Sequence, residues 1–318
     1  MRAYVLRRLL LIIPTLFIVS IIVFTSIRLI PSSVVDIIVS DYYDSPTKAA
    51  LQQVRHELGL DKPMLEQYGI WMGQILVHGN LGKSMIDQTT VAEDLKARWP
   101  VTVELGILAL IFAQIIAIPI GIYSAIRQDS IGDFFARSFA ILTISIPNFF
   151  LATLVIVFPS IWWGYMPPIK LIQFTQDPAG NLQMFVIPAI LLGISMAGLT
   201  MRMTRTMMLE VLRQDYIRTA WSKGLRERVV VLRHALKNAL LPIITIIGSQ
   251  IPLLVSGSVI IENIFQLPGM GQLFLNGISQ RDYTLVSSVV LLYAVALVLV
   301  NLLTDLTYGM LDPRVHYN

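Results

Sequence analysis

Cysteine is absent from this chain of 318 residues, and charged residues are scarce, at 14% of the total. A chain without cysteine forms neither disulfides nor thiolate metal sites. Histidine is also rare, and the four histidines are far apart without the spacing of metal ligands: His56, His78, His234 and His316. We therefore expect neither a disulfide framework nor a metal site.

Hydrophobic residues are abundant, at 55% of the chain, and the mean hydropathy is +0.69. Several apolar runs reach the roughly 20 residues that a helix needs to cross a bilayer. We predict an all-α polytopic membrane protein with six transmembrane helices. The expected spans are 9–27, 101–126, 139–158, 185–201, 240–261 and 285–306. The chain then divides into residues 1–30 with the first span, an excursion 31–94, a core 95–306 and a tail 307–318.

The first apolar run, Leu9–Ile27, could be a signal peptide or a spanning helix. The spanning helix is favoured, because the run exceeds the 7 to 15 apolar residues of a signal and no small-residue cleavage site follows it. Arginines at Arg2, Arg7 and Arg8 would hold its start in the cytoplasm. Fifteen Lys or Arg fall in the proposed inner segments and eight in the outer ones, which predicts that both termini are cytoplasmic.

Acidic residues are missing from the centres of the expected spans. Glu104 and Glu262 fall near outer ends, and Asp305 falls near an inner end. A charge at the bilayer centre costs about 2.5 to 3.5 kcal/mol, so ion-coupled transporters keep one there for a purpose. Proton or sodium coupling is therefore disfavoured. No nucleophile, base and orienting group assemble in a span either, so we assign no catalytic residue and expect energy to come from a partner.

The excursion 31–94 contains a sequence that imitates a nucleotide-binding loop. Gly79–Ser84 reads GNLGKS, but a P-loop has four residues between its two glycines, and here there are two. Chance composition of a turn is the better explanation. Residues 61–77 could form a helix that lies on the membrane surface or one that packs within the excursion, and the sequence leaves both open.

Two further groups of residues are candidates for handling a solute. Polar residues within the spans could line a path, although each alone is more often an interhelical hydrogen bond; they are Gln114, Ser145, Asn148, Ser195, Gln250 and Ser256. The apolar string 262–271 is punctuated by proline and glycine, which predicts a re-entrant outer loop. Its candidate residues are Glu262, Asn263, Phe265, Pro268, Gly269 and Gly271.

The most distinctive stretch is residues 202–237, here called the basic segment, with a net charge of +6 against +4 for the whole chain. Asp215 is predicted to cap a short helix from Tyr216 to Lys223, which Gly224 would end with a left-handed residue. A second helix from Glu227 is expected to bury an apolar face, made up of Val229, Leu232, Leu236 and Ala239. A topology signal or a lipid contact would explain the charge but not this order.

The basic segment resembles a known cytoplasmic signature. The strings DYIRTA at 215–220, KG at 223–224 and RHALKNALLP at 233–242 are similar to those of membrane subunits in binding-protein-dependent ABC importers. The strings ENIFQLPGMG at 262–271 and LGLDKP at 58–63 resemble the first permease of the dipeptide and oligopeptide branch, which is related to nickel permeases. The resemblance covers nearly the whole chain and implies the type I importer permease fold.

The resemblance also implies partners and roles. It implies a second permease, two ATPase subunits that bind ATP and Mg, an extracytoplasmic solute-binding protein and the bacterial or archaeal cytoplasmic membrane, with no cofactor or nucleic acid on this chain. ATPase coupling would fall to Asp215, Tyr216, Ile217, Arg218, Thr219, Ala220, Lys223, Gly224 and Leu225. The expected solute is a short peptide, with nickel chelates, glutathione or another small solute as alternatives. A channel or scaffold with a lipid-binding loop is the alternative of another class.

Overall fold

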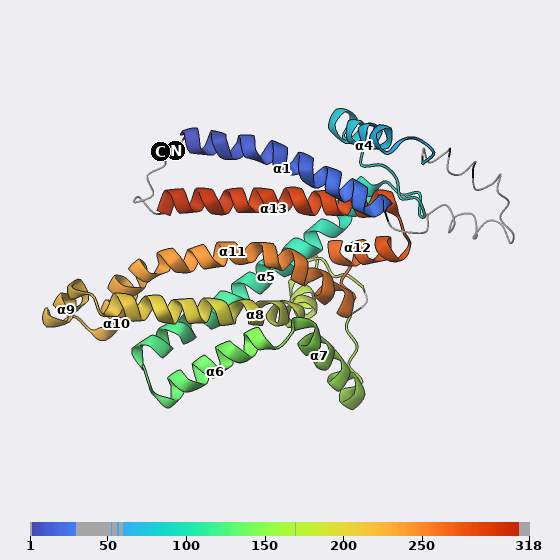
Figure 1. The fold of residues 1–318 in the computed structure, drawn as a ribbon. Helices are drawn as coiled ribbons and strands as arrows, with labels where there is room; N and C mark the ends of the chain where they lie inside the picture. Colours follow the sequence, from blue (N-terminus) through green and yellow to red (C-terminus); the bar gives the residue numbers. More distant parts are fainter. Residues whose placement is uncertain (1, 30–51, 53–55, 57–59, 169, 312–318) are drawn as a thin grey trace. The chain divides into compact units, whose positions relative to one another are not determined.

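The computed structural model describes residues 2–29, 52, 56, 60–168 and 170–311. These residues form helices joined by turns and loops (Figure 1). The helices are α1 (Arg2–Arg28), α4 (Met64–His78), α5 (Val91–Ile126), α6 (Ile131–Ser145), α7 (Asn148–Trp163), α8 (Pro178–Leu212), α9 (Asp215–Ser222), α10 (Glu227–Val229), the π-helix η1 (Val230–Ala235), α11 (Leu236–Ile264), α12 (Met270–Ser279) and α13 (Tyr283–Leu311).

Within the described residues, five helices are long and apolar enough to cross a membrane, and a bent pair of helices would make a sixth span. The five span candidates within the described residues are Arg8–Arg28, Val91–Ile126, Pro178–Leu212, Glu227–Val255 and Tyr283–Thr304. At 35 residues and 1.5 Å per residue, α8 is about 50 Å long, which exceeds the roughly 30 Å of a hydrocarbon core. The expected span 185–201 is therefore only the middle of this helix.

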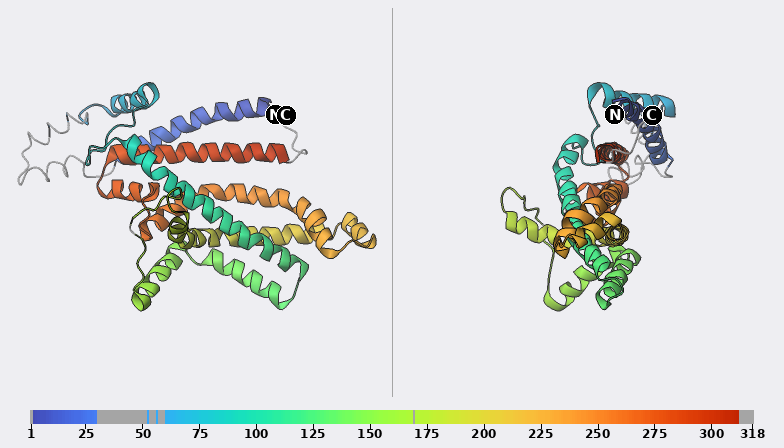
Figure 2. Two further views of the ribbon diagram at one scale, coloured as in Figure 1. Left: turned by 180° about the vertical axis from the view of Figure 1, so that it is seen from behind. Right: turned by 90° about the vertical axis from the view of Figure 1, so that its left-hand side faces the viewer.

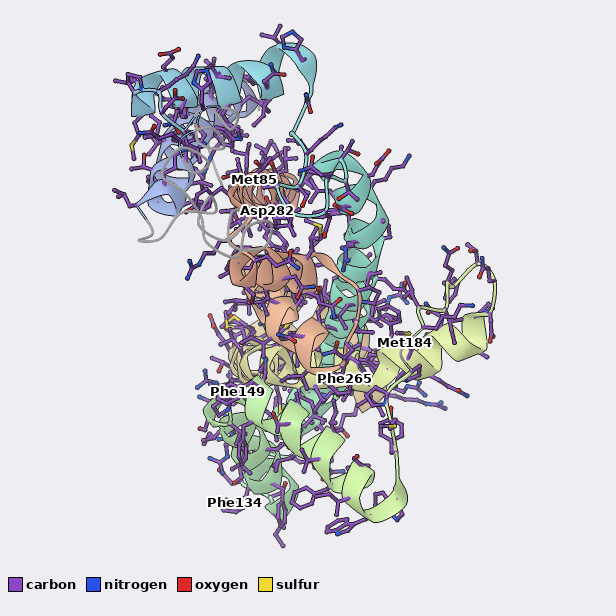
Figure 3. All side chains as sticks on the ribbon, turned by 90° about the vertical axis from the view of Figure 1, so that its right-hand side faces the viewer. Met85, Phe134, Phe149, Met184, Phe265 and Asp282 are labelled. Carbon is purple, nitrogen blue, oxygen red and sulfur yellow. The ribbon has the colours of Figure 1, made fainter. Side chains whose placement is uncertain are left out.

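The third expected span, 139–158, differs most from the prediction. A single spanning helix was expected, but α6 ends at Ser145, α7 begins at Asn148, and the two axes meet at 94°. Pro147 causes the break, because its ring disfavours the helical conformation at the residue before it. Ile146 accordingly has extended backbone angles, with φ −90° and ψ 122°. Exposed aromatic side chains cover this pair, including Phe134 and Phe149 (Figure 3).

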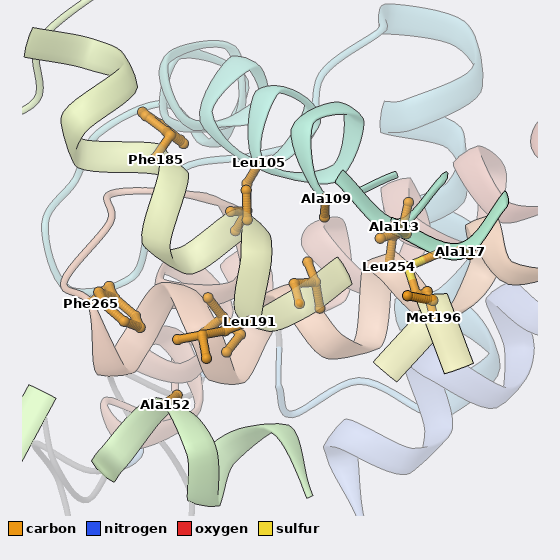
Figure 4. Close-up of a cluster of buried hydrophobic side chains, with 14 of the residues drawn as sticks. Leu105, Ala109, Ala113, Ala117, Ala152, Phe185, Leu191, Met196, Leu254 and Phe265 are labelled. Carbon is orange, nitrogen blue, oxygen red and sulfur yellow. The ribbon is translucent and has the colours of Figure 1, made fainter. Parts of the chain in front are cut away.

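The chain folds as two compact units, one formed by residues 101–268 with the end of α13 and the other by residues 2–100 with 269–298. In the first unit, α8 and α11 run side by side (Figure 2). The core of this unit depends on small residues of α5 at four-residue spacing, Ala109, Ala113 and Ala117, all of them fully buried (Figure 4). Gly193 of α8 fits against them so closely that an added Cβ would lie 2.5 Å from the Ala109 carbonyl oxygen. Such small residues allow membrane helices to approach closely.

The second unit is organised around α1, α4 and the start of α13. The hydroxyl group of Tyr68 of α4 is hydrogen-bonded to Ser20 Oγ of α1 at 2.8 Å, and the Tyr68 ring packs edge-on against Phe24. At the start of α13, Asp282 caps the helix by accepting from the Leu285 N–H, and it also accepts from Ser84 Oγ at 2.6 Å. The segment that imitates a P-loop thus ends at Ser84, whose hydroxyl group is hydrogen-bonded to this cap.

Candidate functional site

The basic segment begins inside α8 and turns at α9, which lies at one end of the first unit (Figure 1). The buried face of α9 consists of Ile217 and Ala220, which join a cluster with Met208 of α8 and Val230 and Val231 of η1. Alternation of these apolar residues with charged ones gives a short amphipathic helix. Packing therefore holds α9 on the ends of the longer helices.

The exposed face of α9 and of the turn after it carries large side chains. Tyr216, Trp221 and Leu225 expose 45%, 42% and 39% of their surfaces. The Tyr216 hydroxyl accepts a hydrogen bond of 2.8 Å from Asn238 Nδ2, which fixes the ring toward the start of α11. An exposed aromatic and aliphatic patch on a rigid support is typical of a surface that binds another protein.

The two ends of α9 differ in how well they were predicted. Gly224 has φ +76°, and its N–H donates to the Trp221 carbonyl at 2.9 Å, so the left-handed residue expected after the helix is confirmed. The capping role predicted for Asp215 is wrong. Gln214 is the N-cap residue, and Asp215 lies in the first turn, where its carboxylate is 3.4 Å from Arg218. The remaining coupling candidates, Thr219 and Lys223, lie within α9 and at its C-cap.

The apolar face predicted for the next helix is wrong in its first half, whereas Leu236 and Ala239 pack against the buried cluster as predicted. Val229 and Leu232 are exposed, whereas Val230, Val231 and Ala235 are buried. Residues Val230–Ala235 form a π-helix, whose wider turn shifts the buried face relative to an α-helical period. Ala239 is buried as predicted, since α11 has resumed α-helical geometry by that position.

Three of the polar residues predicted within the spans lie together. Asn148 of α7, Ser195 of α8 and Gln250 of α11 line a cavity of about 500 Å³, here called the polar cavity. Asn148 Nδ2 donates to Ser195 Oγ at 3.1 Å, and Gln250 Nε2 donates to Thr200 Oγ1 at 3.1 Å. The rest of its lining is mainly aliphatic, with Arg202 at the end toward α9.

The other predicted path residues lie elsewhere. Gln114 of α5 does not line the polar cavity, and neither atom of its amide group has a hydrogen-bond partner in the described part of the chain. Ser145 bonds back to the Ile141 carbonyl at 2.8 Å on an exposed face. The side chain of Ser256 lies outside the described residues.

The outer string 262–271 is partly helical. Glu262 and Asn263 belong to the last turn of α11, so the loop predicted to start at Glu262 begins later. Glu262 is fully buried and accepts a hydrogen bond of 2.7 Å from Thr102 Oγ1 of α5. Phe265 is 3% exposed, and Gly269 precedes α12 as its N-cap residue. Whether the string is re-entrant in the membrane stays a prediction, as does any role of Pro268 and Gly271.

A buried ion pair was missed by the sequence analysis. Asp133 of α6 is fully buried and receives two hydrogen bonds from Arg205 of α8, from Nε at 2.9 Å and from Nη2 at 3.0 Å. Ser124 Oγ and the Asp129 N–H also donate to this carboxylate. The pair links α6 to the part of α8 with which the basic segment begins. The two residues are far apart in the sequence, so only their opposite charges could have indicated the contact.

These features define a class: a multi-pass helical membrane protein with a polar cavity between its spans and an exposed amphipathic helix at one end. Residues 117–317 match the family model of the binding-protein-dependent transport system inner membrane component. Residues 1–106 match the model of the N-terminal region of such membrane components. The chain belongs to this family and is the membrane permease component of a transport system that depends on a binding protein.

Similar proteins align over their full lengths. A protein named as a peptide transport system permease from Brucella suis biovar 1 is 38% identical, with 100% of both chains covered. The dipeptide transport system permease protein DppB of Escherichia coli K12 is 37% identical, covering 100% of this chain and 99% of that protein. The glutathione transport system permease protein GsiC of Escherichia coli O6:H1 is 34% identical, with 99% of each covered.

Solved structures share the fold at low sequence identity. The MetNI methionine ABC transporter in an inward-facing conformation matches with a TM-score of 0.55 at 18% identity, covering 69% of this chain and 96% of that chain. An amino acid ABC transporter with histidines matches with a TM-score of 0.51 at 13% identity, covering 69% and 94%. The fold is therefore that of a type I ABC importer permease, as the sequence predicted.

Proposed function

We propose that this chain is the permease subunit of an ATP-driven importer of dipeptides and oligopeptides in the cytoplasmic membrane of a bacterium or archaeon, with both termini in the cytoplasm. The names of the relatives support the substrate class, since two of the three above are named for peptide transport and the third for glutathione, itself a tripeptide. The distribution of Lys and Arg supports the orientation.

The observation that carries the proposal is the geometry of α9. Its apolar face is buried against α8 and η1, while Tyr216, Trp221 and Leu225 stay exposed beside basic residues. A cleft in an ATPase subunit would receive this exposed face, and movement of the cleft would pass through α9 to α8 and α11. ATP and Mg would be bound and used in that subunit, so this chain would hydrolyse nothing.

The complete importer would contain a second permease, two ATPase subunits and an extracytoplasmic solute-binding protein. The experiment is coexpression of the chain with the ATPase, permease and binding-protein genes beside its own, followed by purification through this subunit in mild detergent. Recovery of a stoichiometric ATPase supports the proposal, and its absence from every preparation would contradict it. The ligand extracted from the purified binding protein identifies the substrate class: a metal chelate without peptide would exclude peptide import.

A further inference from the structure

Helix α4 exposes apolar side chains that the described residues of its own unit leave uncovered. None of its 15 residues is buried, although it packs beside the C-terminal end of α1 (Figure 2). Leu65 and Leu76 expose 86% and 75% of their surfaces. An apolar helix surface of this kind is typical of a site that meets a membrane or another protein. At about 22 Å, α4 is too short to cross a bilayer.

The contacts with α1 give the depth of α4 along a membrane span. The span Arg8–Arg28 has 21 residues and is about 31 Å long, close to the roughly 30 Å of a hydrocarbon core. At the end of this span, Arg28 Nε donates to Gln67 Oε1 at 2.8 Å. The Tyr68 hydroxyl is hydrogen-bonded to Ser20, which lies eight residues, or about 12 Å, nearer the middle of the span. Helix α4 therefore lies between these two levels, within one leaflet.

The side of α4 that points toward the middle of the span is apolar. Tyr68 marks this side, and Leu65, Met72 and Leu76 share it, because they lie three residues before, four after and eight after Tyr68. The Tyr68 ring also reaches Phe17 of α1, with 6.3 Å between the ring centroids. Phe17 belongs to the exposed apolar surface of α1. The apolar side of α4 is thus continuous with a surface that faces lipid in a spanning helix.

The side of α4 near Arg28 is polar. Gln74 and His78 lie seven and eleven residues after Gln67, so they share its side of the helix. In the described part of the chain no carboxylate pairs with Arg28, whose guanidinium lies over the Phe24 ring, 3.7 Å from Cζ to the ring centroid. A cation at the end of a span lies at the level of the lipid phosphates. The polar and apolar sides of α4 therefore match the polarity of a leaflet at this depth.

We propose that α4 is an interfacial helix, embedded in the bilayer leaflet around the C-terminal end of α1, and that lipid acyl chains cover its Leu65–Leu76 side. Under the orientation proposed above, this is the outer leaflet. The helix would anchor the segment that follows it, including Ser84 at the cap of α13, at the bilayer surface. The inference goes beyond the proposed function, because it depends on α1 as a membrane span and not on the transported solute.

The test measures the depth of α4 by spin labelling in proteoliposomes that contain this chain with the subunits that copurify with it. The chain has no cysteine, so each variant carries one label, with cysteine-free partners. Leu65→Cys and Leu76→Cys label the apolar side. Gln74→Cys and His78→Cys are the matched controls, because both positions are exposed on the polar side of the same helix. Ile18→Cys, in the middle of the α1 span and 56% exposed, is the reference for full immersion.

Two relaxing agents report where each label lies. Oxygen concentrates in hydrocarbon, whereas a polar nickel chelate, present on both sides of the bilayer, stays in water. Labels at Leu65→Cys and Leu76→Cys should be mobile. Their ratio of oxygen to nickel collision rates should exceed that at Gln74→Cys and His78→Cys by roughly tenfold and approach that at Ile18→Cys, because a polar chelate partitions poorly into hydrocarbon.

A ratio at positions 65 and 76 no higher than at positions 74 and 78 would place α4 in water and overturn the inference. Immobile labels at 65 and 76 that neither agent reaches would also overturn it, because a protein surface would then cover this side. Dialanine uptake by the complete wild-type importer is measured in parallel. Absent uptake with the raised ratio contradicts only the proposed function, and normal uptake with equal ratios contradicts only the interfacial helix.

Discussion

Replacing Asp133 by alanine should destabilise the membrane core more than most single substitutions. The change removes a fully buried carboxylate and leaves the Arg205 guanidinium, which is 20% exposed, without its bidentate partner. Breaking a buried pair from one side costs about 3 to 5 kcal/mol, because the remaining charge is uncompensated. We expect a loss of this size in the free energy of unfolding, measured by SDS titration of the detergent-solubilised protein.

Two further variants test the reasoning. Arg137→Ala is the control, since Arg137 reaches the same carboxylate only at 3.6 Å from a position 46% exposed, and should cost less than about 1 kcal/mol. The double variant Asp133→Ala with Arg205→Met should be more stable than Asp133→Ala alone, because it removes both charges together. An Asp133→Ala protein as stable as Arg137→Ala would refute the assignment of a buried structural ion pair.

Three more outcomes are expected. The chain has no cysteine, so a single introduced cysteine is the only thiol that can react. Phe265→Cys should react slowly with a membrane-impermeant thiol reagent and Asn263→Cys quickly, because Phe265 is buried and Asn263 is exposed. Equal reaction rates would count against this prediction. Gly193→Ala should lower the free energy of unfolding by about 1 to 3 kcal/mol, because the added methyl group overpacks against a backbone carbonyl. Gly73→Ala should not lower it, because the methyl group added there meets nothing within 4 Å. Asp282→Ala should cost about 1 to 3 kcal/mol in the same SDS titration through lost capping and buried hydrogen bonds.

Local signals in the sequence predicted much of the fold. The length of the apolar runs predicted the spans. Gly224 predicted the end of the short helix, because the left-handed backbone conformation needed there depends only on the local sequence. Span ends were less accurate, since α8 continues well past residue 201 without any change in helical propensity. The π-helix at 230–235 could not be predicted from an α-helical period, and it moved Val229 and Leu232 out of the buried face.

The site depended on contacts between distant residues. Nothing local separates Gln250, which lines the cavity, from Gln114, which does not, because each is a glutamine in an apolar helix. Their different positions follow from how α8 packs on α11 and α7. Asp133 and Arg205 illustrate the same limit: Asp133 falls between two expected spans and Arg205 falls in the basic segment, where solvated charges are the usual outcome. Only the packing of α6 on α8 makes them a buried pair.

The central claim is that α9 transmits force between this chain and an ATPase. Gly224→Asp tests it most directly, because the side chain has open space and the positive φ costs only roughly 1 kcal/mol, too little to unfold the protein. Gly224→Asn is the control, since asparagine tolerates this conformation and adds no charge. Dialanine uptake, ATPase rate and subunit content are measured on the same proteoliposomes. The predicted result is that Gly224→Asp, but not Gly224→Asn, either loses uptake while ATP hydrolysis persists or loses the ATPase subunit. Normal coupled uptake by Gly224→Asp would contradict the claim.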